Sequence, residues 1–158
     1  MRRAKQDAQP IDRGTKGESF RMFDVQAFQT GALAFLVAFG ASLLFLIAFQ
    51  FVYQATTPHN ERKLIRDGNT AAAIVLGGAV VGYALPIAQS MSQAHSLAEF
   101  AAWAVLAGVI QILTFLVVRR IVVADVTTRV ERGEVPIAIY LAAVSIAVGL
   151  LNAASMTE

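Results

Sequence analysis

Few side chains in this sequence have the chemistry of a catalytic or metal site. The chain of 158 residues contains no cysteine, so disulfides, thiolate catalysis and cysteine-based metal sites are excluded. Its two histidines, His59 and His95, fall in loops that the predicted topology places on opposite sides of the protein, so they cannot share a metal. The sequence also contains no Ser-His-Asp set, glycine-rich phosphate loop or metal-spaced cluster. We therefore expect no enzyme activity, no metal and no cofactor.

Two amides stand apart because they fall inside long uncharged stretches of the chain. Gln111 lies in the middle of the third stretch, and Asn152 lies near the end of the fourth. An amide among apolar side chains must find hydrogen-bond partners, and it commonly bonds across to a neighbouring helix. A link between helices is therefore the simpler interpretation, and a polar pathway through the protein is the alternative. Ionisable residues would favour a pathway, and the centres of these stretches contain none.

The elements that hold these residues are four uncharged stretches, which lie between 24 and 61, 67 and 99, 99 and 119, and 134 and 158. The chain is 56% hydrophobic and only 15% charged, whereas a soluble domain is about 25% charged. A bilayer core of about 30 Å needs about 20 apolar residues in a helix, because backbone groups must bond internally in hydrocarbon. The sequence predicts an all-α polytopic membrane protein with four transmembrane helices, at about 28–54, 70–90, 98–119 and 135–155.

The amino-terminal segment differs from the rest of the chain. Residues 1–24 are polar and mixed in charge, so we expect a disordered tail before a transmembrane domain at 25–158. This polar segment and the apolar run that follows it are both too long for a signal peptide. We therefore expect the apolar run to stay in the protein as a transmembrane helix. Met22 offers a second natural start, and translation from Met1 or from Met22 stays open.

Lysine and arginine gather in two of the predicted loops, while the loop at 89–98 and the carboxyl end have none. This bias predicts that the basic loops are cytoplasmic and that both termini are periplasmic, although six basic residues in the tail oppose it if translation begins at Met1. The net charge of +2 therefore indicates membrane orientation rather than nucleic-acid binding. Anionic lipid headgroups or a peripheral protein are the expected partners of the loops. Their basic residues are Arg62, Lys63, Arg66, Arg119, Arg120, Arg129 and Arg132.

The two basic loops lead into similar helices. The run IRDGNTAAAIVL at 65–76 aligns with VERGEVPIAIYL at 130–141 at an offset of 65 residues, which matches Gly68 with Gly133. Further matches at this offset are Ala73 with Ala138, Ile74 with Ile139, Leu76 with Leu141, Leu85 with Leu150 and Ala88 with Ala153. The pattern predicts two duplicated helical hairpins related by an axis along the membrane normal. Chance similarity between apolar segments is the alternative.

Small residues mark helix faces that can approach closely. Gly78 and Gly82 form a GxxxG pattern, for which packing within the chain is the simpler interpretation and self-association the alternative. The glycines expected at helix contacts are Gly77, Gly78, Gly82, Gly108 and Gly149. Pro86 removes a backbone donor, so the second helix should kink or end near Leu85.

The junction at Gly68 and Asn69 precedes the second predicted helix. Asn69 is a good N-cap residue, and capping is the interpretation we favour. A helix start with a glycine before it can also hold an anion, and basic residues lie nearby. In the second repeat Glu134 replaces Asn69, so an anion site common to both copies is doubtful.

The run ERKLIRDGNTAAAIVLGGAVVGYALPIA at 61–88, together with Trp103, Gln111 and the ending SIAVGLLNAASM at 145–156, resembles a known family. It is similar to the domain-of-unknown-function family 350, the YjfL-like bacterial inner-membrane proteins. The resemblance covers about Met22 to Met156 and rests on a Glu–Gly-Asn–AAAI–Gly-Gly–Gly–Pro pattern. It implies four helices, two hairpin repeats and a bacterial inner membrane, with no established activity. Genes of this family often lie beside genes for membrane-stress proteins, so the resemblance also suggests a role related to membrane stress.

Two functional hypotheses remain open. One is a structural or adaptor membrane component whose basic loops recruit a peripheral partner or anionic lipids. The other is a homo-oligomeric small transporter or channel, which the duplicated hairpin, the glycines and Pro86 favour. In a transporter the amides should converge on a wet cavity with Gln89, Ser90, Ser92 and Gln93, whereas in a scaffold these groups should be paired and dry. The lack of a charged residue at membrane depth favours the scaffold.

Overall fold

The computed structural model describes residues 24–57, 61–122 and 125–156, and within these ranges every regular element is helical. The long helices are α1 (Val25–Thr56), α3 (Thr70–Gln93), α4 (Leu97–Val117) and α6 (Val135–Ala154). Two short helices, α2 (Glu61–Arg66) and α5 (Val126–Glu131), precede α3 and α6, and a π-helical turn η1 (Val118–Val122) continues α4. The expected tail up to residue 23, the start at Met22 and the histidine His59 lie outside the described residues.

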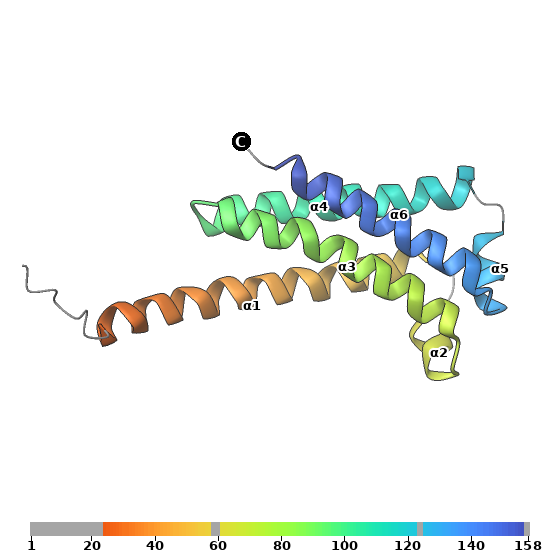
Figure 1. Ribbon diagram of the computed structural model, residues 1–158, viewed down its shortest axis with the longest axis horizontal. Coiled ribbons are helices and arrows are strands. Elements are labelled where there is room, and N and C mark those ends of the chain that lie inside the picture. Colours follow the sequence, from red (N-terminus) through yellow and green to blue (C-terminus); the bar gives the residue numbers. More distant parts are fainter. Residues whose placement is uncertain (1–23, 58–60, 123–124, 157–158) are drawn as a thin grey trace, which may run out of the picture.

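Four of these helices are long and apolar enough to cross a membrane. They lie roughly along one common direction, with α1 at an angle to the others (Figure 1). Their outward faces carry large apolar side chains, such as Leu36 on α1, Leu113 on α4 and Leu151 on α6. The predicted all-α fold with four apolar helices is therefore confirmed.

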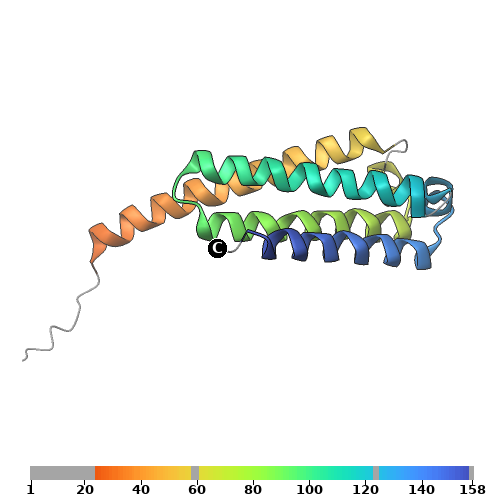
Figure 2. The same cartoon turned by 90° about the horizontal axis from the view of Figure 1, so that it is seen from above.

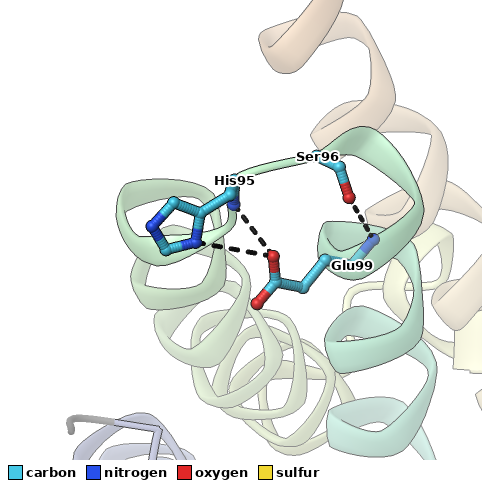
Figure 3. Close-up of polar contacts among 3 residues, drawn as sticks. All are labelled: His95, Ser96 and Glu99. Carbon is cyan, nitrogen blue, oxygen red and sulfur yellow. Dashed lines mark hydrogen bonds and ion pairs between the residues drawn. The ribbon is translucent and has the colours of Figure 1, made fainter.

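Side chains at the helix starts satisfy backbone N–H groups that have no partner within the helix. The Asp24 carboxylate accepts the N–H groups of Gln26 and Ala27 at the start of α1. At the start of α4, Ser96 Oγ accepts the N–H of Glu99 at 3.1 Å, and Glu99 Oε2 accepts the N–H of His95 at 2.9 Å (Figure 3). This reciprocal arrangement resembles a capping box, and it gives Glu99 a local structural role.

The tightest contact in the bundle joins α3 and α6, which run in the same direction side by side (Figure 2). A Cβ added at Gly78 would collide with Ala142, and one added at Gly149 would collide with the carbonyl of Gly82. Gly108 faces the ring of Tyr83 at 3.4 Å, measured from the Cβ position that a side chain would occupy. These four glycines therefore serve contacts within the chain. Gly77 has open space around its Cβ position and makes no such contact.

Helix α3 passes through Pro86 and ends only at Gln93, so it does not end near Leu85. Pro86 itself is buried in the bundle. The sequence predicted that this helix kinks or ends near the proline. The predicted end is wrong, because α3 continues to Gln93, and the kink stays a prediction.

The two junctions that lead into α3 and α6 have the same construction. Helices α2 and α5 begin and end 65 residues apart, and so do the starts of α3 and α6. Gly68 and Gly133 adopt left-handed φ angles of 86° and 78°, which glycine adopts without steric cost. The N–H of Gly68 donates to Ile65 O at 3.0 Å, and the N–H of Gly133 donates to Val130 O at 2.9 Å. The duplicated hairpin stays a prediction, and this equivalence supports it.

Helix α1 is attached to the bundle mainly near its carboxyl end. Its buried side chains are Phe49 and Tyr53, and Phe49 stacks on Tyr83 of α3 with ring centroids 4.2 Å apart. Its amino-terminal half diverges from the other helices in both views (Figures 1 and 2). At about 1.5 Å per residue its 32 residues extend about 48 Å. That length exceeds a bilayer core of about 30 Å, so α1 must tilt or project.

Candidate functional site

The structure gathers the two basic loops at one end of the bundle, which is formed by α2, η1 and α5 (Figure 1). We call this region the basic end. Five of the seven predicted basic residues are exposed there, while Arg119 and Arg129 are half-buried. Residues from both halves of the chain thus contribute to a single surface, as the sequence predicts from loop charge alone.

The basic end also contains carboxylates, which reduce its positive field. Arg129 Nε donates to Glu134 Oε2 at 2.6 Å, so this guanidinium is already paired within the turn before α6. The acidic residues of the region are Glu61, Asp67, Asp125, Glu131 and Glu134. The surplus of positive charge is therefore small, and the positions of the exposed arginines and lysine matter more than the total charge.

Two of the arginines are held in place by groups of α1. The guanidinium of Arg62 lies 4.9 Å from the centroid of the Phe51 ring, within the range of a cation–π contact. Arg119 Nη1 lies 3.4 Å from the carbonyl oxygen of Thr56, in the last turn of α1. A cation at a helix carboxyl terminus interacts favourably with the helix dipole. Both contacts tie the end of α1 to the basic end.

Asn69 joins the junction before α3 to the end of α5 at this end of the bundle. Its side-chain oxygen accepts the N–H of Ala72 at 2.9 Å and caps α3. Its amide nitrogen donates to the carbonyls of Val130 at 2.9 Å and of Glu131 at 3.1 Å, at the end of α5. Both amide protons are thus engaged with the protein itself, which favours capping over anion binding at Gly68 and Asn69.

Glu61 is the residue at this end that the sequence reasoning missed, because it was counted as a loop charge. Its side chain is buried, with only 1% exposed, at the first position of α2. The Tyr53 hydroxyl group lies beside it. Burial raises the pKa of the Glu61 carboxyl to about 7, although the neighbouring Tyr53 hydroxyl acts to lower it. The available signal was spacing, since Glu61 shares a helix face with the core-packed Leu64 and Ile65.

The intramembrane polar groups singled out from the sequence contact neighbouring helices. Gln111 of α4 is 3% exposed, and its Nε2 donates to Ser145 Oγ at 2.6 Å and to Ser145 O at 3.0 Å on α6. Asn152 of α6 lies with its Nδ2 3.5 Å from Ala107 O on α4. Ser90 and Ser92 bond to carbonyls of their own helix. None of the hydrogen bonds described for these four side chains joins one of them to another.

An apolar groove opens where α1 diverges from the bundle. It has a volume of about 380 Å³ and lies between α1 and the turn from α3 to α4, with His95 at its edge. Leu33 and Val37 of α1 face Leu97 and Phe100 of α4 across it. His95 therefore lies at the end of the bundle opposite to the basic end.

These features define a class: a helical membrane protein with four apolar spans, one charged end and no charged residue in the middle of its described spans. Residues 27–156 match the model of a family described as Domain of Unknown Function (DUF350). The chain belongs to this family, as the resemblance at 61–88 indicated.

Relatives with curated names agree with this assignment. The chain is 34% identical over 125 residues to the UPF0719 inner membrane protein YjfL of Escherichia coli strain K12, across 79% of this chain and 94% of that protein. It is 28% identical over 79 residues to the UPF0719 transmembrane protein YshE of Bacillus subtilis strain 168, across 50% of this chain and 59% of that protein. No solved structure is significantly similar to it. The chain is a multi-pass inner-membrane protein.

Proposed function

We propose that this protein is a structural or adaptor component of the inner membrane, with the basic end in the cytoplasm and both termini in the periplasm. The observation that carries this proposal is the convergence of α2, η1 and α5, from both halves of the chain, on one charged surface. Each exposed lysine or arginine near an anionic leaflet contributes roughly 1 kcal/mol of attraction. That surface suits anionic headgroups or an acidic peripheral protein, and the proposal includes no catalytic activity.

The transporter or channel is the second candidate, and one observation favours its homo-oligomeric form. Only 6% of the apolar window of α1 is buried within the chain, so a long apolar helix face is free to meet lipid or another copy. Against transport, Gln111 lies between tightly packed helices and bonds to Ser145. The α3–α6 contact at Gly78 and Gly149 is also too close to leave a passage between those two helices.

The test is cross-linking in native membranes followed by affinity purification and mass spectrometry. The adaptor proposal expects a stoichiometric peripheral protein that disappears when four basic residues are neutralised together, as R62Q, K63Q, R129Q and R132Q. A matched control neutralises three acidic residues of the same end, as D67N, D125N and E131Q, and should retain the partner. Recovery of self-linked copies alone would overturn the adaptor proposal and favour a homo-oligomer.

A further inference from the structure

A small cavity lies between α4 and α6, close to the hydrogen bonds that join Gln111 to Ser145. It has a volume of about 20 Å³, and its walls include the hydroxyl-bearing side chains of Thr114 and Ser145. The other wall residues are apolar: Phe115, Val118, Leu141 and Val144. A cavity of about 10–15 Å³ is large enough for one water molecule, provided that two to four polar groups can bond to it.

The two hydroxyl groups in the cavity wall have hydrogen-bonding capacity that the described residues do not use. Ser145 Oγ accepts from Gln111 Nε2 at 2.6 Å, and no described residue accepts the Ser145 hydroxyl proton. The Thr114 hydroxyl donates to Ile110 O at 2.9 Å, so its oxygen can still accept a hydrogen bond. A water molecule both donates and accepts, so it can satisfy both hydroxyl groups at once.

The amide of Gln111 has unused hydrogen-bonding capacity in the same layer of the bundle. Its Nε2 lies 3.0 Å from the Ser145 carbonyl oxygen. A carbonyl oxygen can only accept, so the arm of the amide that meets it must be the nitrogen. The other arm is Oε1, which is buried and has no hydrogen-bond partner among the described residues. A buried polar atom of this kind is commonly explained by a bound water or ion.

The packing of the bundle keeps this polar layer in the interior. A Cβ at Gly82 of α3 would collide with Gln111 Nε2 and Ser145 O, so a glycine there leaves room for their hydrogen bond. The cavity also lies at the boundary between two apolar clusters of buried side chains. Phe115 packs against one of these clusters, and Leu141 belongs to the other. The apolar packing is therefore interrupted where the polar groups lie.

We propose that the cavity between α4 and α6 binds one water molecule, which accepts the Ser145 hydroxyl proton and donates to Thr114 Oγ1. Its second proton is available to the buried acceptors of this layer, among which Gln111 Oε1 has no partner in the described part of the chain. The water thus joins α4 to α6 within the apolar part of the bundle, where direct hydrogen bonds between the two helices leave these groups incompletely bonded.

The proposed water is isolated and does not belong to a path across the membrane. The next polar side chains along the inner face of α4 are directed to carbonyl groups of α4 itself. Tyr83 donates from its hydroxyl to Ala104 O at 3.0 Å, and Asn152 Nδ2 lies 3.5 Å from Ala107 O. The water site therefore agrees with a packed bundle and goes beyond the proposed adaptor function.

The experiment measures magnetisation transfer from water to methyl groups, by solid-state NMR of the full chain in phosphatidylcholine vesicles. The methyl groups of Thr114 and Val144 line the cavity and should receive magnetisation from water. Leu113 is the matched control, because it adjoins Thr114 in sequence and is 54% exposed on the outer surface of the bundle. Its lipid-facing methyl groups should receive none. The buried methyl group of Ala104 should also receive none, because the site is isolated.

Two substitutions at position 114 assign the water to its proposed partners. Thr114→Val keeps the shape of the side chain and removes the hydroxyl, so the water has a single hydroxyl partner in the cavity wall. The transfer to Val144 should then be lost. Thr114→Ser is the matched control, because it retains the hydroxyl, and it should retain the transfer to Val144.

A third substitution distinguishes a wet cavity from a dry one by the sign of its effect on the melting temperature. Val144→Ile adds one carbon to the cavity wall. If water is bound, this carbon displaces it, and Tm should fall by about 2–4 °C, the shift for one lost hydrogen bond in a chain of this size. In a dry cavity the same carbon fills space and raises Tm. Val109→Ile, at an exposed position of α4, is the control and should leave Tm unchanged.

Several results would overturn the proposal. Wild-type protein without transfer to Thr114 and Val144 would show that the cavity is dry, and so would a higher Tm for Val144→Ile. Equal transfer to Leu113 would show that water reaches this depth from the lipid side. Transfer to Ala104 would indicate a continuous water path and would favour the transporter or channel. The wild-type spectra decide between these outcomes even if a variant does not fold.

Discussion

Among single residues, Glu61 occupies the environment that its side-chain type least prefers. Glutamate is among the residue types that are least often fully buried, and the Glu61 side chain is only 1% exposed, beside Tyr53. Leu64 and Ile65 pack into the core from the same face of α2, so the helix that buries them also turns Glu61 inward. The first position of α2 therefore combines a core location with a titratable group.

Replacing Glu61 with glutamine should stabilise the protein at high pH and leave it unchanged in acid. The folded-state pKa is about 7 and the ordinary value is 4.5, so the wild type loses stability as pH rises between these values and no further above them. The full difference corresponds to about 3 kcal/mol in favour of the variant. Unfolding in mixed micelles at about pH 5 and pH 8 measures it, and an equal difference at both pH values would contradict it.

Asn69 should contribute more to stability than an ordinary helix cap. Removing a cap costs about 1 kcal/mol, and Asn69→Ala also removes the two bonds to Val130 and Glu131. We expect a total loss of about 2–3 kcal/mol, since each hydrogen bond adds roughly 1 kcal/mol. Asn69→Ser retains a capping oxygen but cannot replace both donors, so its loss should be intermediate. Thermal unfolding of the three proteins gives the order, and equal stability of Ser and Asn at this position would contradict the bridging role.

Among the elements, the crossing of α3 and α6 fixes the bundle. Gly149→Ala places a methyl group against the carbonyl of Gly82, and the backbones must separate. We expect a loss of at least about 1–3 kcal/mol from overpacking. Gly77→Ala is the matched control, because the Cβ position there is open, and alanine in a helix interior should be neutral or stabilising by up to about 1 kcal/mol. Unfolding in mixed micelles compares them, and similar losses at both sites would mean that α3 and α6 do not meet as described.

At the scale of the elements, sequence patterns predict the membrane spans but not which helices contact each other. Long uncharged runs predict the four spans because a bilayer demands apolar length, and that demand acts on composition alone. The closeness of Gly82 to Gly149 could not be predicted, because a GxxxG pattern marks a contact face without identifying its partner. The burial of Glu61 was missed for a related reason: whether a short loop helix packs inward depends on where α1 and α4 end. The charge of Glu61 predicted a position in a loop, whereas its side chain is buried in the structure.

For the whole molecule, α1 and the rest of the bundle meet the bilayer differently. Helices α3, α4 and α6 pack on one another, whereas α1 exposes nearly all of its length and diverges at the end away from the charged loops (Figure 2). The exposed face of α1 is where another copy or a different membrane protein could pack. The proposed function therefore assigns contacts within the membrane to the apolar face of α1, and contacts with peripheral partners to the basic end.

Orientation in the membrane is the property that connects these two surfaces to cell compartments. Lys63 is exposed at the basic end, and His95, with a side chain 93% exposed, lies at the opposite end of the bundle. Because the chain has no cysteine, Lys63→Cys and His95→Cys each provide one labelling site on an otherwise unreactive protein. The positive-inside bias predicts that an impermeant maleimide added to intact spheroplasts labels position 95 and reaches position 63 only after lysis. The reverse order would place the basic end in the periplasm and remove the cytoplasmic adaptor role. Labelling of both positions from outside would contradict the four-span arrangement itself, because α3 separates these two sites by one crossing of the bilayer.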